Sequence, residues 1–138
     1  WLKLGPMSSP NAPTTTVSVE SMPEGVMGLD IGAETLEAFK RHLASAKTVI
    51  WNGPMGVFEM EPFAAGTIGL ARHLASLRGV TTIVGGGDTV AAVEKLGLQA
   101  KFTHVSTGGG ASLSVLAGEK LPGVEALEES EKIFFRKK

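Results

Sequence analysis

The sequence predicts a doubly wound α/β domain with a mostly parallel sheet, and three observations support this fold class. Short strand-like runs alternate along the chain with segments in which apolar residues repeat every three or four positions. The runs at residues 48–51, 81–84 and 102–106 each lead directly into a turn. These turns are rich in glycine, which allows sharp changes of backbone direction. Alternating strands and helices are typical of right-handed βαβ units around a parallel sheet.

Length, charge and hydropathy restrict the possible function classes. The 138 residues suffice for one domain with a hydrophobic core. The formal net charge of −1 gives no sign of the basic surface that binds nucleic acid, so we expect no nucleic-acid partner. No apolar run approaches the roughly 18 residues needed to cross a membrane, so we expect no membrane partner either. The chain begins with Trp1 rather than methionine, which we interpret as the sign of a fragment.

The first part of the chain is predicted to be irregular. Residues 1–16 contain three prolines and show no hydrophobic periodicity. This segment ends near a short strand-like run of threonine, serine and valine at residues 15–19. A helix is expected from Ala33 onward, because four apolar residues fall on one face at helical spacing, namely Leu36, Phe39, Leu43 and Ala46.

The middle of the chain contains the first complete strand–turn–helix unit. Residues 48–51 form a continuous apolar run, which predicts a strand buried on both faces of a parallel sheet. An irregular loop with two glycines and a proline follows at residues 52–56. The next helix is expected over residues 66–77, with Gly79 placed to end it.

Two further units repeat this plan. The strand-like residues 81–84 lead into Gly85-Gly86-Gly87-Asp88, and a helical pattern with Val90 and Val93 follows. The last unit has a strand at residues 102–106, a turn ending at Gly110 and a helix over residues 111–117. Ligands of open α/β sheets lie beyond the carboxyl ends of the strands. The glycine-rich turns at these ends therefore predict a binding site.

Two acidic residues beside these turns each allow two interpretations. Asp88 is either a cap of its own helix, worth about 1 kcal/mol, or a ligand of Mg²⁺ held against a bound polyphosphate. The two roles are compatible with one another. Glu59 is either a solvated loop acid or an acceptor for sugar hydroxyls. None of the turns fits GxxxxGK[ST], and none fits GxGxxG with an acidic residue about 20 positions later, which disfavours the common nucleotide-binding motifs.

Several motifs together resemble those of phosphoglycerate kinases. They are GLDIG at residues 28–32, WNGPMGVFE at 51–59, GGGDT at 85–89, STGGGAS at 106–112 and LPGV at 121–124. The match runs in order from about Val17 to Leu127. The resemblance implies a Rossmann-like, three-layer α/β/α fold, here an incomplete domain. It also implies reversible phosphoryl transfer in glycolysis between 1,3-bisphosphoglycerate and ADP, with Mg²⁺ and ATP/ADP as cofactors.

The resemblance assigns roles to individual positions. Glu59 is expected to accept a hydrogen bond from the ribose, and Asp88 is expected at the metal ion. The backbone N–H groups of Gly108, Gly109 and Gly110 are expected to meet the phosphoryl group in flight. The positions expected to bind nucleotide are Asn52, Gly53, Pro54, Gly56, Val57, Glu59, Gly85, Gly86, Gly87, Asp88 and Thr89.

The sequence also lacks parts that the family's enzymes need for catalysis. The family's amino-terminal domain, which binds 3-phosphoglycerate or 1,3-bisphosphoglycerate, has no counterpart here, and neither do the first βα units with their nucleotide-binding lysines. We therefore expect residues 17–127 to be a partial nucleotide-binding domain between an irregular segment (1–16) and a tail (128–138). Such a chain should be inactive alone, in the cytoplasm or a plastid. The alternative is a non-catalytic nucleotide-binding or interaction module that retained the fold.

Overall fold

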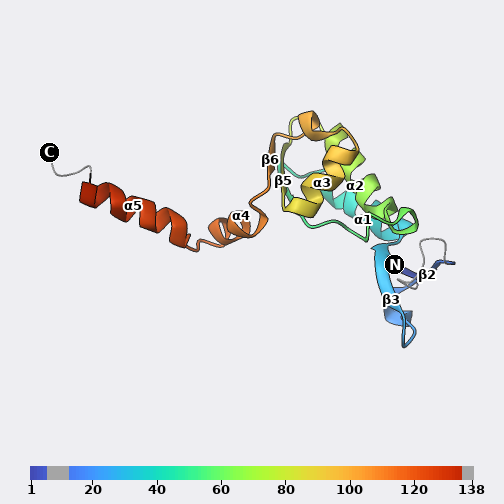
Figure 1. Ribbon diagram of the computed structural model, residues 1–138. Coiled ribbons are helices and arrows are strands. Elements are labelled where there is room, and N and C mark those ends of the chain that lie inside the picture. Colours follow the sequence, from blue (N-terminus) through green and yellow to red (C-terminus); the bar gives the residue numbers. More distant parts are fainter. Residues whose placement is uncertain (6–12, 135–138) are drawn as a thin grey trace. The chain divides into compact units, whose positions relative to one another are not determined.

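The computed structural model describes residues 1–5 and 13–134, which divide into two units. The first unit comprises residues 1–107 and the second comprises residues 108–138. Strands and helices alternate through most of the first unit, as Figure 1 shows. The predicted α/β class with a parallel sheet is therefore confirmed.

A small antiparallel sheet opens the first unit. Strand β1 (Leu2–Gly5) lies between β2 (Thr15–Val17) and β3 (Met27–Ile31), and a 3₁₀ turn, η1 (Val19–Ser21), follows β2. The prediction that residues 1–16 are irregular is thus wrong for residues 2–5, whereas the strand predicted at residues 15–19 is confirmed for residues 15–17. The part of that segment at residues 6–12 lies outside the described residues.

Burial explains why the strand forms in a segment without periodicity. Leu4 of β1 and Leu29 of β3 are each 4% exposed, so one face of this sheet is covered. Gly5 lies against the ring of Phe63, because a Cβ added at Gly5 would be 2.6 Å from Cζ of that ring. Contacts with a residue 58 positions later in the chain leave no periodic signal in the local sequence.

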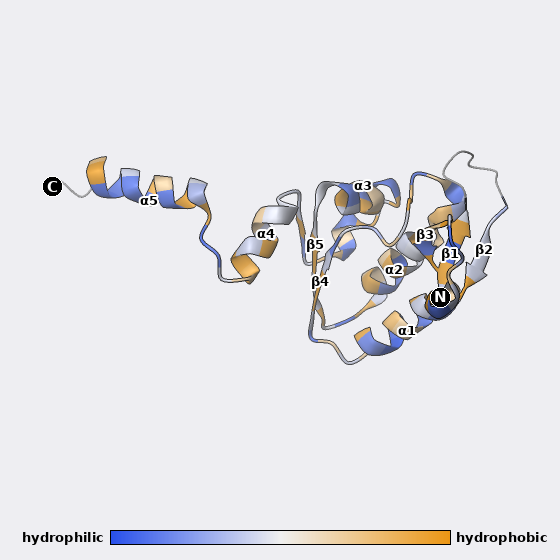
Figure 2. Ribbon diagram, turned by 90° about the horizontal axis from the view of Figure 1, so that it is seen from below, coloured by the Kyte–Doolittle hydropathy of each residue, from blue (hydrophilic) through white to orange (hydrophobic). Residues whose placement is uncertain are grey.

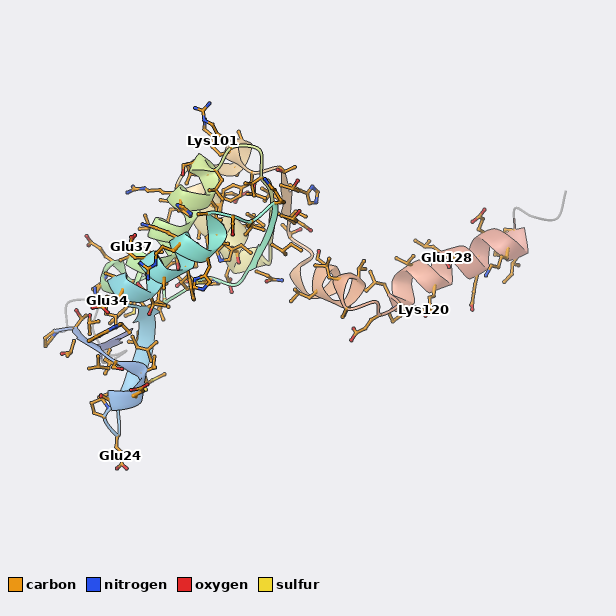
Figure 3. All side chains as sticks on the ribbon, turned by 180° about the vertical axis from the view of Figure 1, so that it is seen from behind. Glu24, Glu34, Glu37, Lys101, Lys120 and Glu128 are labelled. Carbon is orange, nitrogen blue, oxygen red and sulfur yellow. The ribbon has the colours of Figure 1, made fainter. Side chains whose placement is uncertain are left out.

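The second sheet is parallel and has the order β4-β5-β6. Its strands are β4 (Thr48–Asn52), β5 (Thr81–Gly85) and β6 (His104–Ser106). The crossovers contain α2 (Ala65–Ser76) and α3 (Gly87–Lys95), with short 3₁₀ turns η2 (Glu61–Phe63) and η3 (Gln99–Lys101). Helix α1 (Ala33–Leu43) precedes β4 and carries Glu34 and Glu37, labelled in Figure 3. The predicted strands and the helices α2 and α3 are confirmed to within two residues, whereas α1 ends at Leu43, three residues before Ala46, which the sequence pattern placed on its apolar face.

The helices of the first unit cover one face of the parallel sheet. Figures 1 and 2 show α1, α2 and α3 on the same side of β4 and β5. Val49, Trp51 and Val84 point into the core on that side, together with Leu70 and Val93 of the helices. The neighbouring Ile50 is 41% exposed. The prediction that residues 48–51 are buried on both faces is therefore wrong, because within this unit only one face has a helical layer.

Within residues 108–134, the described part of the second unit, the chain forms two helices. Helix α4 (Gly109–Leu116) begins two residues before the predicted start at residue 111. Helix α5 (Pro122–Phe134) continues through residue 128, where a separate tail was expected, and residues 135–138 lie outside the described residues. Lys120 and Glu125 form an exposed ion pair at 2.9 Å near the start of α5. Among the described residues, none of the helices combines the length and hydrophobicity that a membrane crossing requires.

Candidate functional site

The carboxyl ends of β4 and β5 lie next to one another. Asn52, the last residue of β4, is the partner of Gly85, the last residue of β5, in the parallel register. The turns that follow these strands are therefore neighbours, as the sequence predicted. Gly85 is in turn the partner of Ser106 at the end of β6. The predicted catalytic glycines belong to the second unit, where Gly108 is the N-cap of α4 and Gly109 and Gly110 lie in its first turn.

A buried threonine joins the two neighbouring turns. The backbone N–H of Gly53 donates to Oγ1 of Thr89 at 2.7 Å, and the Thr89 side chain is completely buried. On the other side of the same turn, Nε1 of Trp51 donates to the carbonyl oxygen of Gly53 at 2.7 Å. Thr89, predicted to contact nucleotide, thus directs its hydroxyl to the neighbouring turn rather than to solvent.

Gly86 can be only glycine in this arrangement. Its φ of +89° lies in the region that side chains rarely adopt, and a Cβ added there would be 2.6 Å from Oδ1 of Asn52. The Gly86 carbonyl accepts the first hydrogen bond of α3, from the N–H of Val90 at 3.0 Å. Backbone N–H groups at the start of a helix and the positive end of its dipole together favour an anion.

Asp88 does not cap its own helix. The N-cap of α3 is Gly86, and no side chain makes a cap hydrogen bond there. The first of the two roles considered for Asp88 is therefore wrong. Its carboxylate is exposed in the first turn of α3, beside Gly87, which is also exposed.

The exposed carboxylate of Asp88 could contribute a single ligand to a metal ion. Among residues 1–5 and 13–134, no three histidine, aspartate or glutamate side chains group closely enough to hold a metal ion by themselves. Mg²⁺ in nucleotide sites takes one or two carboxylates and completes its shell with phosphate oxygens and water. A single exposed aspartate could hold such an ion only together with ligands that the described residues do not supply.

The loop after β4 is fixed by a second buried threonine. Oγ1 of Thr67, near the start of α2, accepts from the N–H groups of Met55 at 3.0 Å and Gly56 at 3.3 Å. The N–H of Val57 donates to the carbonyl of Leu29 in β3 at 2.9 Å. The Thr67 side chain is completely buried. The loop therefore holds its shape through contacts with α2, which follows it, and with β3, which is remote in sequence.

A buried aspartate lies behind this loop and was not among the predicted site residues. Asp30 is 3% exposed and accepts hydrogen bonds from the N–H of Gly66 and from its own neighbour Ile31, each at 2.9 Å. Burial raises the pKa of its carboxyl, while those two N–H groups and the charge of Lys3 act in the opposite direction. The available signal was an acidic residue inside the apolar run of residues 29–31.

Glu59 lies in a different environment from Asp88. It lines a cavity of about 260 Å³ between the 58–64 segment, α2 and α3, and the other lining residues include Thr67, Ala92 and Lys95. Lys95 is at the end of α3, whereas Asp88 is at its start. A single ligand that reached both Glu59 and Asp88 would therefore have to extend along α3.

A family model and two similar proteins of known name all point to the same family. A family model described as phosphoglycerate kinase matches residues 5–119. The chain is 61% identical over 120 residues to the phosphoglycerate kinase of Trichodesmium erythraeum, covering 87% of this chain and 30% of that protein. It is 59% identical over 121 residues to the chloroplastic phosphoglycerate kinase of Volvox carteri, covering 86% of this chain and 26% of that protein.

Two solved structures resemble the chain as well. Phosphoglycerate kinase from Coxiella burnetii superposes with a TM-score of 0.80 at 37% identity, covering 90% of this chain and 32% of that one. The enzyme from Pyrococcus horikoshii gives a TM-score of 0.77 at 34% identity, covering 96% of this chain and 32% of that one. The chain thus spans about a third of the length of the relatives that it matches.

Proposed function

The chain belongs to the phosphoglycerate kinase family, and from that premise we propose that its residues supply most of the magnesium–nucleotide site of such an enzyme. The enzyme would transfer a phosphoryl group reversibly between 1,3-bisphosphoglycerate and ADP. The observation that supports this proposal most directly is the pair of adjacent turns after β4 and β5, joined by the bond from Gly53 to Thr89.

The proposed assignment follows the chemistry of each position. Residues 17–127 form part of the nucleotide-binding domain. The phosphates lie against the start of α3 at residues 85–88, where helix N–H groups favour an anion. The base and ribose lie along residues 52–59, where Glu59 accepts from the ribose hydroxyls. Bound Mg²⁺ would neutralise charge on the phosphate oxygens, and Asp88 is the residue that would hold it.

The three glycines of α4 have the remaining proposed role. Gly108, Gly109 and Gly110 present the start of a helix, and backbone dipoles fixed there can stabilise a phosphoryl group in transfer. Phosphoryl transfer depends on positioning and charge stabilisation more than on covalent chemistry. Binding of phosphoglycerate would require a domain that lies outside the matched region of the family. The proposed compartment is the cytoplasm, although the name of the Volvox relative places that protein in the chloroplast.

The metal role of Asp88 can be tested by calorimetry. We expect wild-type chain to bind ADP more tightly with Mg²⁺ than without, because the ion bridges phosphate and carboxylate. Asp88→Asn should weaken binding of MgADP about tenfold or more, since a charge-assisted contact is lost. The same variant should bind metal-free ADP at least as well as wild type does, because a carboxylate repels a bare anion.

Glu94→Gln provides the matched control for that experiment. Glu94 is exposed on the same helix but lies in its second half, away from the phosphate-facing turn. Its replacement should leave the magnesium dependence unchanged. Equal magnesium dependence in wild type and Asp88→Asn would refute the metal role, whereas a wild-type chain that binds no ADP would refute the nucleotide site itself.

Turnover gives a second test of the proposal. We expect no phosphoryl transfer by the 138 residues alone, because the groups that bind phosphoglycerate are not among the proposed site residues. ADP formation from ATP can be followed in the presence and absence of 3-phosphoglycerate. A rate that depends on 3-phosphoglycerate would show that the chain is catalytic by itself and contradict this expectation.

A further inference from the structure

Asp30 occupies an unusual place relative to the proposed site. It belongs to β3 of the antiparallel sheet, a different sheet from the one that ends at the site. Its carboxylate is nonetheless buried against Gly56, in the segment that connects β4 to α2, and against Gly66, in the first turn of α2. A buried carboxylate requires compensation by hydrogen bonds, and Asp30 receives two of them from backbone N–H groups.

The first of its roles is to complete the start of α2. The helix has Ala64 at its N-cap position, and no side chain of the local sequence makes a cap hydrogen bond there. Oδ2 of Asp30 accepts from the N–H of Gly66 in the first turn instead. A negative charge at this end of a helix also interacts favourably with the helix dipole. Asp30, in strand β3, thus caps the N-terminus of helix α2.

The second role is to define the path of the loop. A Cβ added at Gly56 would be 2.6 Å from Cγ of Asp30 and equally close to the carbonyl oxygen of Phe63, and it would overlap Oδ1 of Asp30 as well. A Cβ added at Gly66 would also overlap Oδ1 of Asp30. The loop and the helix start therefore both approach this carboxylate as closely as glycine permits.

Thr67 links the two roles. It follows Gly66 directly, and its hydroxyl accepts from the N–H groups of Met55 and Gly56. A contact that fixes the first turn of α2 therefore also fixes the position of the Thr67 hydroxyl, which is the acceptor for the loop amides. The carbonyl of Leu29, next to Asp30, accepts from Val57 at the other end of this loop.

We propose that Asp30 is a positioning residue for the nucleotide site, which acts by fixing the start of α2 and, through Thr67, the loop at residues 53–57. The expected effect of Asp30 on nucleotide affinity rests on the proposed function. The structural part of the inference, the control of the loop by Asp30, can be measured without nucleotide. Both carboxyl oxygens of Asp30 accept an N–H in the structure, and no other side chain of similar size offers two acceptor oxygens in that geometry.

Asp30→Asn is the most informative variant. It preserves size, but one of its two terminal atoms is a donor, so either Gly66 or Ile31 loses its acceptor. Hydrogen exchange of the Met55 and Gly56 amides should become faster by about tenfold, and MgADP affinity should fall by about the same factor, as expected for one lost hydrogen bond to a charged group. Exchange is read by NMR and affinity by calorimetry.

Thr82→Val is the matched control. Thr82 is also buried, and its hydroxyl accepts from the N–H of Thr103 at 3.2 Å, near the opposite end of β5 from the site. The substitution removes one buried acceptor and should reduce stability without altering the loop. Exchange at Met55 and Gly56, compared at equal global stability, should remain at the wild-type rate in this control.

The pH dependence of stability tests whether the buried carboxyl of Asp30 is the group that matters. Lys3 of β1 lies opposite Asp30 in the strand register, and the groups that face it from α2 and the loop are Gly66 and Gly56. Because burial raises the pKa of Asp30, its native form binds a proton more tightly than the unfolded chain does. Stability should therefore fall as pH rises from the ordinary carboxyl range through the raised pKa. The difference in unfolding free energy between wild type and Asp30→Asn should decrease over that window.

A measurement on wild type decides the question even if Asp30→Asn does not fold. The amide resonances of Gly66, Met55 and Gly56 should titrate together, with one midpoint above the ordinary aspartate value. Titration of Gly66 without Met55 and Gly56 would overturn the proposal, and so would wild-type exchange rates in a folded Asp30→Asn. Altered exchange with unchanged MgADP affinity would likewise overturn the role in binding. If wild type binds no MgADP, the proposed function fails, and the amide data still decide whether Asp30 holds the loop.

Discussion

Replacement of Phe63 by alanine is expected to lower the free energy of unfolding by about 3–5 kcal/mol. The Phe63 side chain is completely buried, and its ring contacts Gly5 of β1. Its removal would leave a cavity between the antiparallel sheet and the segment before α2. Because small domains are stabilised by roughly 5–15 kcal/mol in total, the loss would be a large fraction of the stability.

The effect is measured by urea unfolding of the two proteins at equal concentration. Phe134→Ala is the control, because Phe134 at the end of α5 is 73% exposed and should contribute little. The amides of β1 should also lose protection in Phe63→Ala but not in the control. A loss of stability no larger for Phe63→Ala than for Phe134→Ala would contradict the packing of β1 against this ring.

Gly56→Ala is expected to damage both stability and nucleotide binding. The added Cβ would meet Cγ of Asp30 and the carbonyl oxygen of Phe63, each at 2.6 Å. Neither neighbour is the free end of a flexible side chain, so the backbone of the loop must move. Overpacking of this kind costs roughly 1–3 kcal/mol, and the displaced loop should bind MgADP at least about tenfold more weakly if it lines the proposed site.

Gly123→Ala makes the same chemical change in a permissive place. A Cβ added at Gly123, in α5, meets no atom within 4 Å, and its φ is not positive. Because alanine favours helix over glycine, this variant should be as stable as wild type or slightly more stable. Chemical unfolding and calorimetry of both variants provide the comparison. Equal stability of Gly56→Ala and Gly123→Ala would show that the contact with Asp30 is looser than the structure indicates.

Local patterns predicted the elements of the parallel sheet well. The threonine- and valine-rich run before the three glycines became β5, and the spacing of Val90 and Val93 identified α3. Strand propensity, helical periodicity and glycine at chain reversals are properties of a few consecutive residues. The adjacency of the turns after β4 and β5 followed from the topology of βαβ units alone.

The same patterns failed where structure depends on distant contacts. Strand β1 pairs with β2 and β3 in a segment that has no periodicity of its own. Ile50 belongs to an apolar run but is exposed, whereas its neighbours Val49 and Trp51 are buried. Asp88 is of a residue type that often caps helices. However, α3 already begins at Gly87, so the N-cap position falls on Gly86 and Asp88 lies inside the first turn.

The sequence by itself determined the order of strands and helices around the parallel sheet, the glycine turns and the membership of a family, since all of these depend on short motifs. Only the tertiary structure decided which side chains hold the turns in place. Thr89 reaches Gly53 and Asp30 reaches Gly66 over 36 positions of chain in each case. Such bonds depend on how strands and helices pack, and burial makes their geometry strict because an unpaired polar group inside the protein is costly.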